Sequence, residues 1–273
     1  MHYEIIESVL LNYHRIIGVN SNIPHQIYLD VNKKNNSFIK YIKNKYPEVD
    51  VNTTEKYTVH FSINCTIYPD MISRLHTDGK HFYISHRVNK KLLELPNVFY
   101  LTPLCNDNNK YFIPTHLPKV EKIQSDIPIY CVQGNIASFR RNYSLLTEIL
   151  KHDYDYDFKI KLIGRGKLPK MLEPYKDKII LKNNLNFMDY HNEFRDVYCI
   201  LPLITRKSHG SYYMKKLTSS ISYGLGYDLN FLIDEYLQNI YNVPKAFVFQ
   251  DINNIVQVFT NSLQNFYDKP LKM

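Results

Sequence analysis

The chain has 273 residues and a formal net charge of +8, and 44% of its residues are hydrophobic and 14% aromatic. This length fits one large domain or two small ones, and this composition excludes an intrinsically disordered chain. No apolar run approaches the roughly 18 residues of a membrane span, so we expect no transmembrane segment.

The positive charge is dispersed along the chain. The lysines and arginines do not form a dense stripe interleaved with aromatic residues, which is the pattern typical of nucleic-acid-binding grooves. We therefore expect no nucleic-acid partner, whereas a small anionic ligand needs only a local positive site.

The cysteines and the first residues bear on the compartment. Cys65, Cys105, Cys131 and Cys199 are scattered and form no C-x-x-C pair, which favours reduced, buried thiols over disulfides or zinc. The opening MHYEIIESVLLNYHRII carries charges among apolar residues at helical spacing and predicts a helix, not a signal peptide. We expect a cytoplasmic, reducing location. Asn, Lys, Ile and Tyr are abundant, which is typical of genes with a low GC content. Such genes occur in low-GC organisms and in large DNA viruses. For a viral protein, the expected location is the host cytoplasm or the virion.

The first half alternates helix and strand signals after the opening helix. The predicted strands cover residues 25–31, 56–63, 80–88 and 97–104, and the predicted helices cover residues 38–46 and 70–75. Strands separated by helices indicate a parallel sheet with right-handed crossovers. Residues 107–125 contain two prolines and no sustained period, which predicts a linker between a domain at 1–118 and a domain at 119–273.

The second half repeats the alternation more regularly. The predicted strands cover residues 127–133, 158–163, 178–181, 197–204, 229–233 and 246–249, and the predicted helices cover residues 140–150, 168–175, 186–195 and 252–267. The predicted fold class is α/β, with two Rossmann-like domains of which the N-terminal one is short.

The segment 212–235 combines features of a phosphate site. It begins with a basic, hydroxyl-rich helix start, followed by a predicted glycine turn at Gly224 and Gly226 and an apolar strand. Lysines, hydroxyls and the free amides of a helix N-terminus together can hold a phosphate group. The alternative interpretation is an amphipathic helix with a solvated lysine face, followed by a buried strand.

Several motifs in the second half resemble one enzyme family. VQGNIASFRRNYSLL, FKIKLIGRG, KIILKNNLNFMDYHNEFRDVYCILPLI and YYMKKLTSSISYGLGYDLNFLIDEYLQNIY occur in an order and spacing similar to those of glycosyltransferases with two Rossmann domains, the GT-B fold. The resemblance covers about residues 127–267 and is to the nucleotide-sugar-binding domain of that family.

The resemblance implies a donor site on the following residues. The glycine turn after the first strand matches Gly134 and Asn135, and a basic residue facing the diphosphate matches Arg140 or Arg141. The G-x-G turn after the second strand matches Gly164 and Arg165, and the residues that read the base match Asn183, Asn184 and Tyr190. The helix that holds the diphosphate matches Lys215, Thr218, Ser219 and Ser220. The implied partners are a nucleotide sugar and a glycan, protein or lipid-linked acceptor, with no cofactor and no bound metal.

Glycosyl transfer also benefits from a general base for the acceptor hydroxyl. The first candidate is His86, which should emerge at the carboxyl edge of a parallel strand, and the second is His60. His2 and Glu4 follow, whereas a surface or structural role is the ordinary alternative for each single histidine.

The sequence departs from the family pattern at two acidic positions. Retaining members carry a pair of acids eight residues apart, and the matching positions here are Met214 and Ser222. A catalytically inactive relative that binds a sugar nucleotide or glycan is therefore the first alternative. An unrelated doubly wound protein with another phosphorylated ligand or nucleic acid is the second.

The tract 153–157 contains Asp-x-Asp twice, the metal-binding signature of another glycosyltransferase class. It precedes a predicted strand, whereas metal-binding acids should follow the carboxyl end of a strand, so we expect no metal there.

Overall fold

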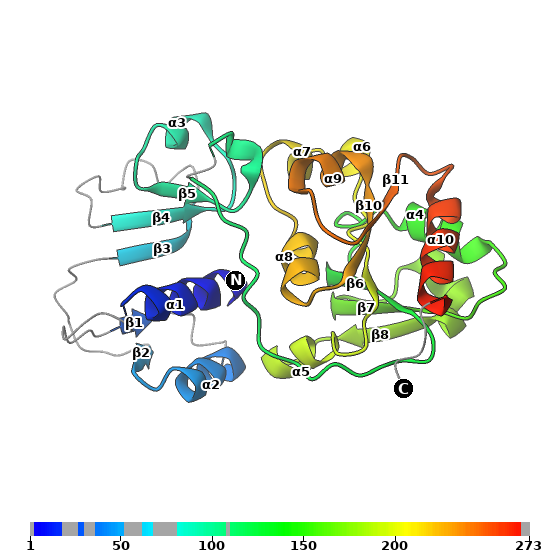
Figure 1. Cartoon of the computed structure of the whole chain (residues 1–273), viewed down its shortest axis with the longest axis horizontal. Helices are drawn as coiled ribbons and strands as arrows, with labels where there is room; N and C mark the ends of the chain where they lie inside the picture. Colours follow the sequence, from blue (N-terminus) through cyan, green and yellow to red (C-terminus); the bar gives the residue numbers. More distant parts are fainter. Residues whose placement is uncertain are drawn as a thin grey trace.

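The computed structural model describes residues 3–17, 27–29, 36–51, 62–67, 81–107 and 110–268. An N-terminal portion with short strands lies beside a C-terminal portion that is built on a six-stranded sheet (Figure 1). The chain passes between them along residues 112–128, which contain no helix and no strand. The predicted linker at 107–125 thus lacks regular secondary structure in its described part.

All six strands of the C-terminal sheet are parallel, in the order β11-β10-β9-β6-β7-β8. The strands are β6 (Ile129–Asn135), β7 (Lys159–Arg165), β8 (Ile179–Asn183), β9 (Cys199–Ile200), β10 (Asn230–Asp234) and β11 (Ala246–Phe249). The connecting helices are α4 (Tyr143–Lys151), η3 (Lys170–Lys178), α5 (Phe187–Asn192), α6 (Arg206–His209), α7 (Ser211–Met214), α8 (Ser219–Gly226), α9 (Glu235–Tyr241) and α10 (Ile255–Tyr267). Numbered within this portion, the strand order is 3-2-1-4-5-6, the Rossmann order.

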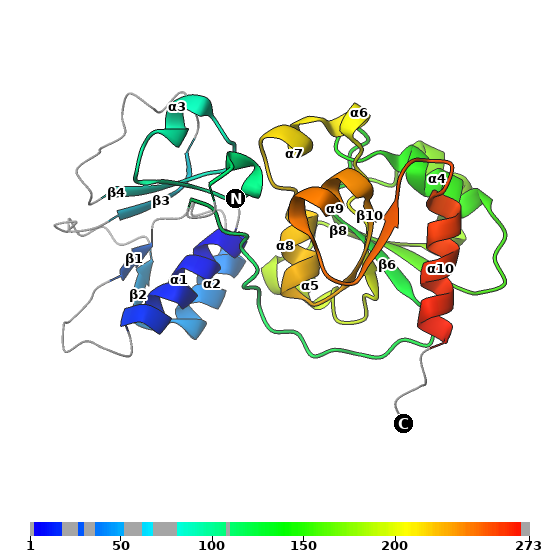
Figure 2. The ribbon, with the colours of Figure 1, turned by 45° about the horizontal axis from the view of Figure 1, so that its top comes forward.

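Both faces of this sheet are buried, as a parallel sheet requires. Tyr130 and Val132 of β6 pack into one core cluster with the apolar faces of α4 and α10. Cys131, between them, points to the other face and into the cluster that holds Ile221 of α8. Figure 2 shows α8 and α10 on opposite sides of the sheet. The predicted doubly wound arrangement is therefore present in the C-terminal portion.

The N-terminal portion contains two separate parallel sheets in its described residues. Strands β1 (Ile27–Leu29) and β2 (Val49–Val51) form one, and β3 (Ser62–Ile67), β4 (His81–Ser85) and β5 (Val98–Tyr100) form the other. The helices are α1 (Tyr3–Ile17), α2 (Asn36–Lys45), α3 (Lys90–Leu93) and η2 (Pro103–Cys105). The sequence predicts one sheet here, whereas the described strands form two.

The two portions share core residues. Ile5 of α1, Ile84 of β4 and Leu101 belong to the same buried cluster as Ile221 and Phe231 of the C-terminal portion. A second contact joins α2 to α5, where the Phe38 and Phe187 ring centroids are 5.1 Å apart. The two portions are thus packed against each other through apolar side chains.

The strand predicted at 197–204 is wrong in its length. Only Cys199 and Ile200 pair with neighbouring strands. Pro202 has no N–H to donate to a ladder, and Leu203 adopts a positive φ of 47°. The apolar run is buried as predicted, but its backbone turns away from the sheet.

The glycine turn predicted at Gly224 and Gly226 is also wrong, because both residues lie inside α8. A Cβ at Gly224 would lie 2.1 Å from Cζ of Phe231, and a Cβ at Gly226 would lie 2.5 Å from the carbonyl oxygen of Thr115. These glycines allow α8 to approach its neighbours closely, and no turn is needed.

Several predictions fall wholly or partly outside the described residues, among them the two ends of the strand at 25–31. The helix at 70–75 lies outside them, and so does most of the strand at 56–63, whereas β3 continues to Ile67. Cys105, Cys131 and Cys199 are free and buried, as predicted. Among the described residues, no helix has the length and apolarity to cross a membrane.

Candidate functional site

The strand order places a crevice at the carboxyl ends of β6 and β9. The chain connects β6 to β7 on one side and β9 to β10 on the other, so the loops that follow β6 and β9 diverge. Ligands of open α/β sheets bind at such a switch point. The predicted Gly134 and Asn135 are the last residues of β6 and therefore lie at this crevice.

Two glycines allow the ends of β6 and β7 to meet. Gly134 and Gly164 are paired in register and have positive φ angles of 108° and 158°. A Cβ at Gly164 would lie 1.5 Å from the carbonyl oxygen of Gly134, a distance that no side chain allows. The N–H of Asn184 donates to the carbonyl of Gly164 at 3.0 Å. The structure thus brings three of the predicted residues together, whereas the side chain of Arg165 at the end of β7 is exposed.

The two candidate arginines have opposite environments. Arg141 is 5% exposed, and its guanidinium donates to the carbonyls of Gln133 and Arg140. Burial lowers the pKa of Arg141, while the nearby Tyr212, Tyr143 and Tyr190 raise it. Arg140 is exposed and lies over the ring of Phe139, with 5.3 Å between the guanidinium carbon and the ring centroid. Arg141 is therefore the arginine at the crevice.

Arg141 belongs to a group of three basic side chains, which we call the cationic cluster: Arg141, Lys216 and His209. Lys216 is 9% exposed, and its Nζ lies 4.1 Å from the ring centroid of Tyr212. Burial lowers the pKa of His209, the backbone of Phe139 raises it, and the charges of Arg141 and Lys216 lower it further. The positive charges of Arg141 and Lys216 thus both act on the imidazole of His209.

The cationic cluster lacks an anionic partner. Within the described part of the chain, no carboxylate forms an ion pair with Arg141 or Lys216. By contrast, the buried Lys161 lies 2.6 Å from Asp196 and 3.3 Å from Glu193. Because a buried charge is costly unless it is compensated, the cluster is suited to an anionic ligand.

Hydroxyl groups from two helices extend this site. Tyr190 of α5 donates to Oε1 of Gln133 at 2.9 Å, and Nε2 of Gln133 donates to Oγ of Ser219 at 2.8 Å. Among the described residues, the hydroxyl of Ser220 is buried without a hydrogen-bond partner. Thr218, the N-cap residue of α8, makes no side-chain capping bond. The predicted residues Tyr190, Thr218, Ser219 and Ser220 therefore gather around β6 and the start of α8.

The segment before α8 also contacts the N-terminal portion. The N–H of Val88 donates to the carbonyl of Lys215 at 2.7 Å, and Arg87 pairs with Lys216 in an antiparallel bridge. The half-buried His86 directly precedes this contact, whereas His60 and His2 lie outside the described residues. The Lys215 side chain is exposed, so Lys216 supplies the buried lysine.

A pocket of about 600 Å³ lies at the carboxyl edge of β6 and β7. It is lined by the two loops that follow these strands, through Ile136, Ala137, Ser138, Phe139, Gly166, Lys167, Pro169, Lys170 and Met171. This lining contains two lysines and no acidic residue, and the Phe139 ring is 72% exposed. Its charge therefore has the same sign as that of the cationic cluster.

The aspartates of the tract 153–157 lie at the opposite edge of the sheet. They are exposed in the turn between α4 and β7, before the amino end of β7. The described residues contain no group of three or more His, Cys, Asp or Glu side chains that could hold a metal ion.

Gln133, His209 and Tyr212 were not among the predicted site residues, and Lys216 was predicted only as part of the basic helix start in the segment 212–235. Lys216 is adjacent to a predicted lysine, so the sequence signal was present but did not distinguish the two. His209 and Tyr212 reach the site through the short helices α6 and α7, which carry no periodic pattern long enough to predict.

No protein-family model and no curated protein matches the chain. Among solved structures, the crystal structure of a glycosyltransferase from Rickettsia africae ESF-5 matches 96% of this chain and 84% of its own, with a TM-score of 0.56 and 12% sequence identity. At this identity the likeness establishes the fold alone. The chain therefore shares the α/β fold of that structure, with a Rossmann-like parallel sheet.

Proposed function

We propose that the chain is a metal-independent glycosyltransferase of the GT-B type that transfers a sugar from a nucleotide sugar to an acceptor. Residues 1–118 form the acceptor-side domain in this proposal, and residues 119–273 form the donor domain. The observation that carries it is the pair of buried cations Arg141 and Lys216, which form no ion pair with a carboxylate of the described residues and lie at the switch point beside the start of α8.

The residues at the crevice suit a departing nucleoside diphosphate. Negative charge grows on the diphosphate as the sugar leaves, and fixed cations and helix-start amides stabilise that charge more in the transition state than in the ground state. Arg141 and Lys216 supply positive charge, while Ser219 and Ser220 supply hydroxyls at the start of α8. Because these side chains supply the charge, the proposal requires no metal.

The remaining predicted residues surround this diphosphate position. Gly134 allows the Arg141 guanidinium to lie close to the end of β6, and Arg165 and Asn184 lie at the carboxyl ends of β7 and β8, on the base side. On the acceptor side, we assign the general base to His86, because the adjacent residues Arg87 and Val88 contact the segment that carries Lys216.

Calorimetric titration with UDP, GDP, ADP and CMP tests the donor site, with Arg140→Met as the matched control for Arg141→Met. We expect Arg141→Met to weaken binding of the preferred nucleotide at least tenfold, or about 1.4 kcal/mol, because it removes the buried cation. Arg140→Met should change the affinity less than about threefold, since the loss of an exposed charge is worth under about 1 kcal/mol. Arg141→Lys keeps the charge and should retain part of the affinity.

Equal effects of Arg140→Met and Arg141→Met would place the diphosphate elsewhere, and a loss of affinity with EDTA would contradict metal independence. In the same preparation, His86→Asn should abolish transfer from a radiolabelled donor while leaving nucleotide affinity unchanged. Full transfer activity in that variant excludes His86 as the base.

A second function, donor binding without turnover, is favoured by the residues at the two positions where the resemblance predicts acids. Ser222 is fully buried in α8, and Met214 is 62% exposed. Neither position supplies the carboxylate that retaining enzymes of this family carry. Nucleotide-sugar binding with no hydrolysis or transfer across a broad acceptor panel would favour this alternative.

A further inference from the structure

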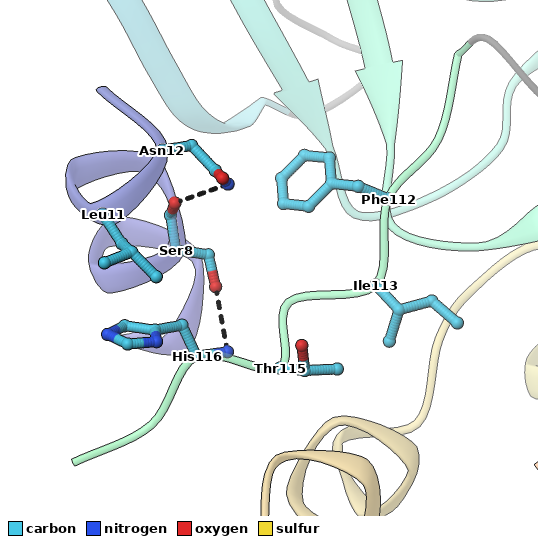
Figure 3. Close-up of a pocket in the computed structure, with 7 residues that line it drawn as sticks. All are labelled: Ser8, Leu11, Asn12, Phe112, Ile113, Thr115 and His116. Atoms are coloured by element: carbon cyan, nitrogen blue, oxygen red, sulfur yellow. Dashed lines mark hydrogen bonds between the residues drawn. The ribbon is translucent and has the colours of Figure 1, made fainter. Parts of the chain in front are cut away.

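A second pocket, of about 280 Å³, lies between α1 and the segment that connects the two portions. Ser8, Leu11 and Asn12 line it from α1, and Phe112, Ile113, Thr115 and His116 line it from the connecting segment (Figure 3). Pockets for drug-sized ligands occupy roughly 300–1,000 Å³. This pocket therefore suits a ligand about as large as one sugar ring.

The polar groups of this pocket suit a neutral ligand. Among the described residues, its lining contains no lysine, arginine, aspartate or glutamate. Nδ2 of Asn12 donates to the carbonyl of Ser8 at 2.9 Å, which leaves Oδ1 and a second N–H for a ligand. Oγ of Ser8 accepts from the N–H of His116 at 3.4 Å and keeps its own hydrogen to donate. Groups that both donate and accept match sugar hydroxyls, which do the same.

An aromatic face completes the pocket. Figure 3 shows the Phe112 ring pointing toward Asn12 across the opening. The apolar C–H face of a pyranose ring packs on an aromatic ring, while its hydroxyls turn to the polar groups beside it. The pocket at the edge of β6 and β7 has two lysines instead, so the two pockets differ in the charge of the ligand that each suits.

The pocket lies within reach of the proposed donor site by two paths. Burial raises the pKa of Tyr190, and the charge of Glu4 contributes, so Glu4 of α1 lies near the donor site. Ser8 lies four residues further along α1, about 6 Å along the helix axis. On the second path, Thr115 packs against Gly226, seven residues or about 10 Å along α8 from Ser219. A short oligosaccharide spans such a distance.

We propose that this pocket binds one neutral sugar ring of the acceptor, and that the acceptor is a glycan instead of a protein or a lipid. The inference rests on the proposed glycosyltransferase function, because it treats the crevice at β6 and β9 as the donor site. It adds the chemical class of the acceptor and the residues that hold it.

Saturation-transfer NMR on the full chain, without nucleotide, tests the pocket directly. The probes are the monosaccharides and disaccharides of glucose, galactose, mannose and N-acetylglucosamine. We expect saturation transfer to at least one of them, and we expect Asn12→Leu and Phe112→Leu each to weaken that sugar's affinity at least fivefold. Asn12 is exposed, so Asn12→Leu should keep the wild-type melting temperature. The matched control is Asn239→Leu, an exposed asparagine on α9, which should leave sugar binding unchanged.

Absence of saturation transfer from all eight probes, or equal sugar affinity in wild type and Asn12→Leu, overturns the proposal. Because the sugar is measured without nucleotide, failure of the donor-site proposal has a different signature: wild-type protein that binds no nucleoside diphosphate. Nucleotide affinity that stays constant in Asn12→Leu while sugar affinity falls supports the acceptor pocket specifically.

Discussion

Arg141 is a cation held almost entirely out of water, and no carboxylate of the described residues forms an ion pair with it. Its guanidinium donates to two backbone carbonyls, which compensate part of the desolvation but carry no full negative charge. The second buried cation, Lys216, lies over the Tyr212 ring and is compensated by the negative face of that ring. Both side chains would gain more from a bound anion than from water, and this is the physical reason for placing the diphosphate here.

His191 is also buried, but as a neutral side chain, in contrast to the buried cations Arg141 and Lys216. It is 1% exposed, its Nδ1 lies 2.6 Å from the Tyr227 hydroxyl, and its ring stacks on Tyr223. Burial lowers the pKa of His191 to about 3. The side chain is therefore a neutral member of the core in the folded protein at pH 7.

Acid should destabilise the protein through His191. Its pKa of about 3 in the folded state is below the unfolded value of about 6.5, so the unfolded chain binds a proton that the folded chain excludes. The full stability contribution is present above pH 6.5, and about 1.4 kcal/mol is lost per pH unit as the pH falls from 6.5 toward 3. Urea unfolding of wild type and His191→Gln at pH 6.5, 5.5 and 4.5 measures this slope. Parallel slopes in the two proteins would show that His191 is not the titrating group.

At this scale the sequence named many of the side chains that the structure gathers around β6 and the start of α8, but it did not predict their environments. Arg140 and Arg141 were equivalent candidates, because their burial depends on how the loop turns from β6 into α4. The exposed Lys215 was selected where the structure buries Lys216, since burial here depends on the contact with residues 87–88 of the N-terminal portion. Local residue patterns distinguish neither Arg140 from Arg141 nor Lys215 from Lys216.

At the scale of elements, α8 connects the core to the site. Its start carries Ser219 and Ser220, and its last turns pack against β9 and β10 with Gly224 at the closest approach. A Cβ there would also lie 2.9 Å from a methyl carbon of Ile200. The position of the helix start is thus set by a glycine contact more than one helical turn away.

Gly224→Ala should destabilise the protein and weaken nucleotide binding together. The added methyl overpacks the contact with Phe231, which costs about 1–3 kcal/mol and displaces α8. Phe231→Leu removes the ring atoms that collide, so the double variant should be more stable than the sum of the single effects by about 0.5 kcal/mol or more. Denaturant unfolding and UDP titration of the four proteins form the cycle. Strictly additive effects in this cycle would falsify the contact as the cause.

Periodic patterns predicted the long elements and failed at the short ones. Helices α1 and α10 were found because their apolar residues recur at helical spacing, and strands β6 and β7 were found because each contains a run of apolar residues. The pairing of β9 ended early because Pro202 and Leu203 redirect a chain that stays buried, and burial alone does not define a strand. The glycines of α8 resembled a turn because composition does not reveal how closely a helix approaches its sheet.

For the whole molecule, the packing of the two portions determines what faces the crevice. Ile84 of β4 joins the shared core, and the residues after β4 form the bridge to Lys216. This arrangement brings the end of β4, with His86, close to the segment that carries Lys215 and Lys216. The sequence predicted that a histidine would end this strand, but only the packing of the two portions shows which part of the C-terminal portion it approaches.

We propose that a nucleoside diphosphate binds between the cationic cluster and the start of α8. A crystal structure of the chain soaked with the nucleotide that binds best in calorimetry tests it most directly. We expect diphosphate oxygens within hydrogen-bond distance of the Arg141 guanidinium and of the first amides of α8, with the base toward the loops that follow β7 and β8. A nucleotide bound away from the carboxyl ends of β6 and β9, or no bound nucleotide at millimolar concentration, would contradict it.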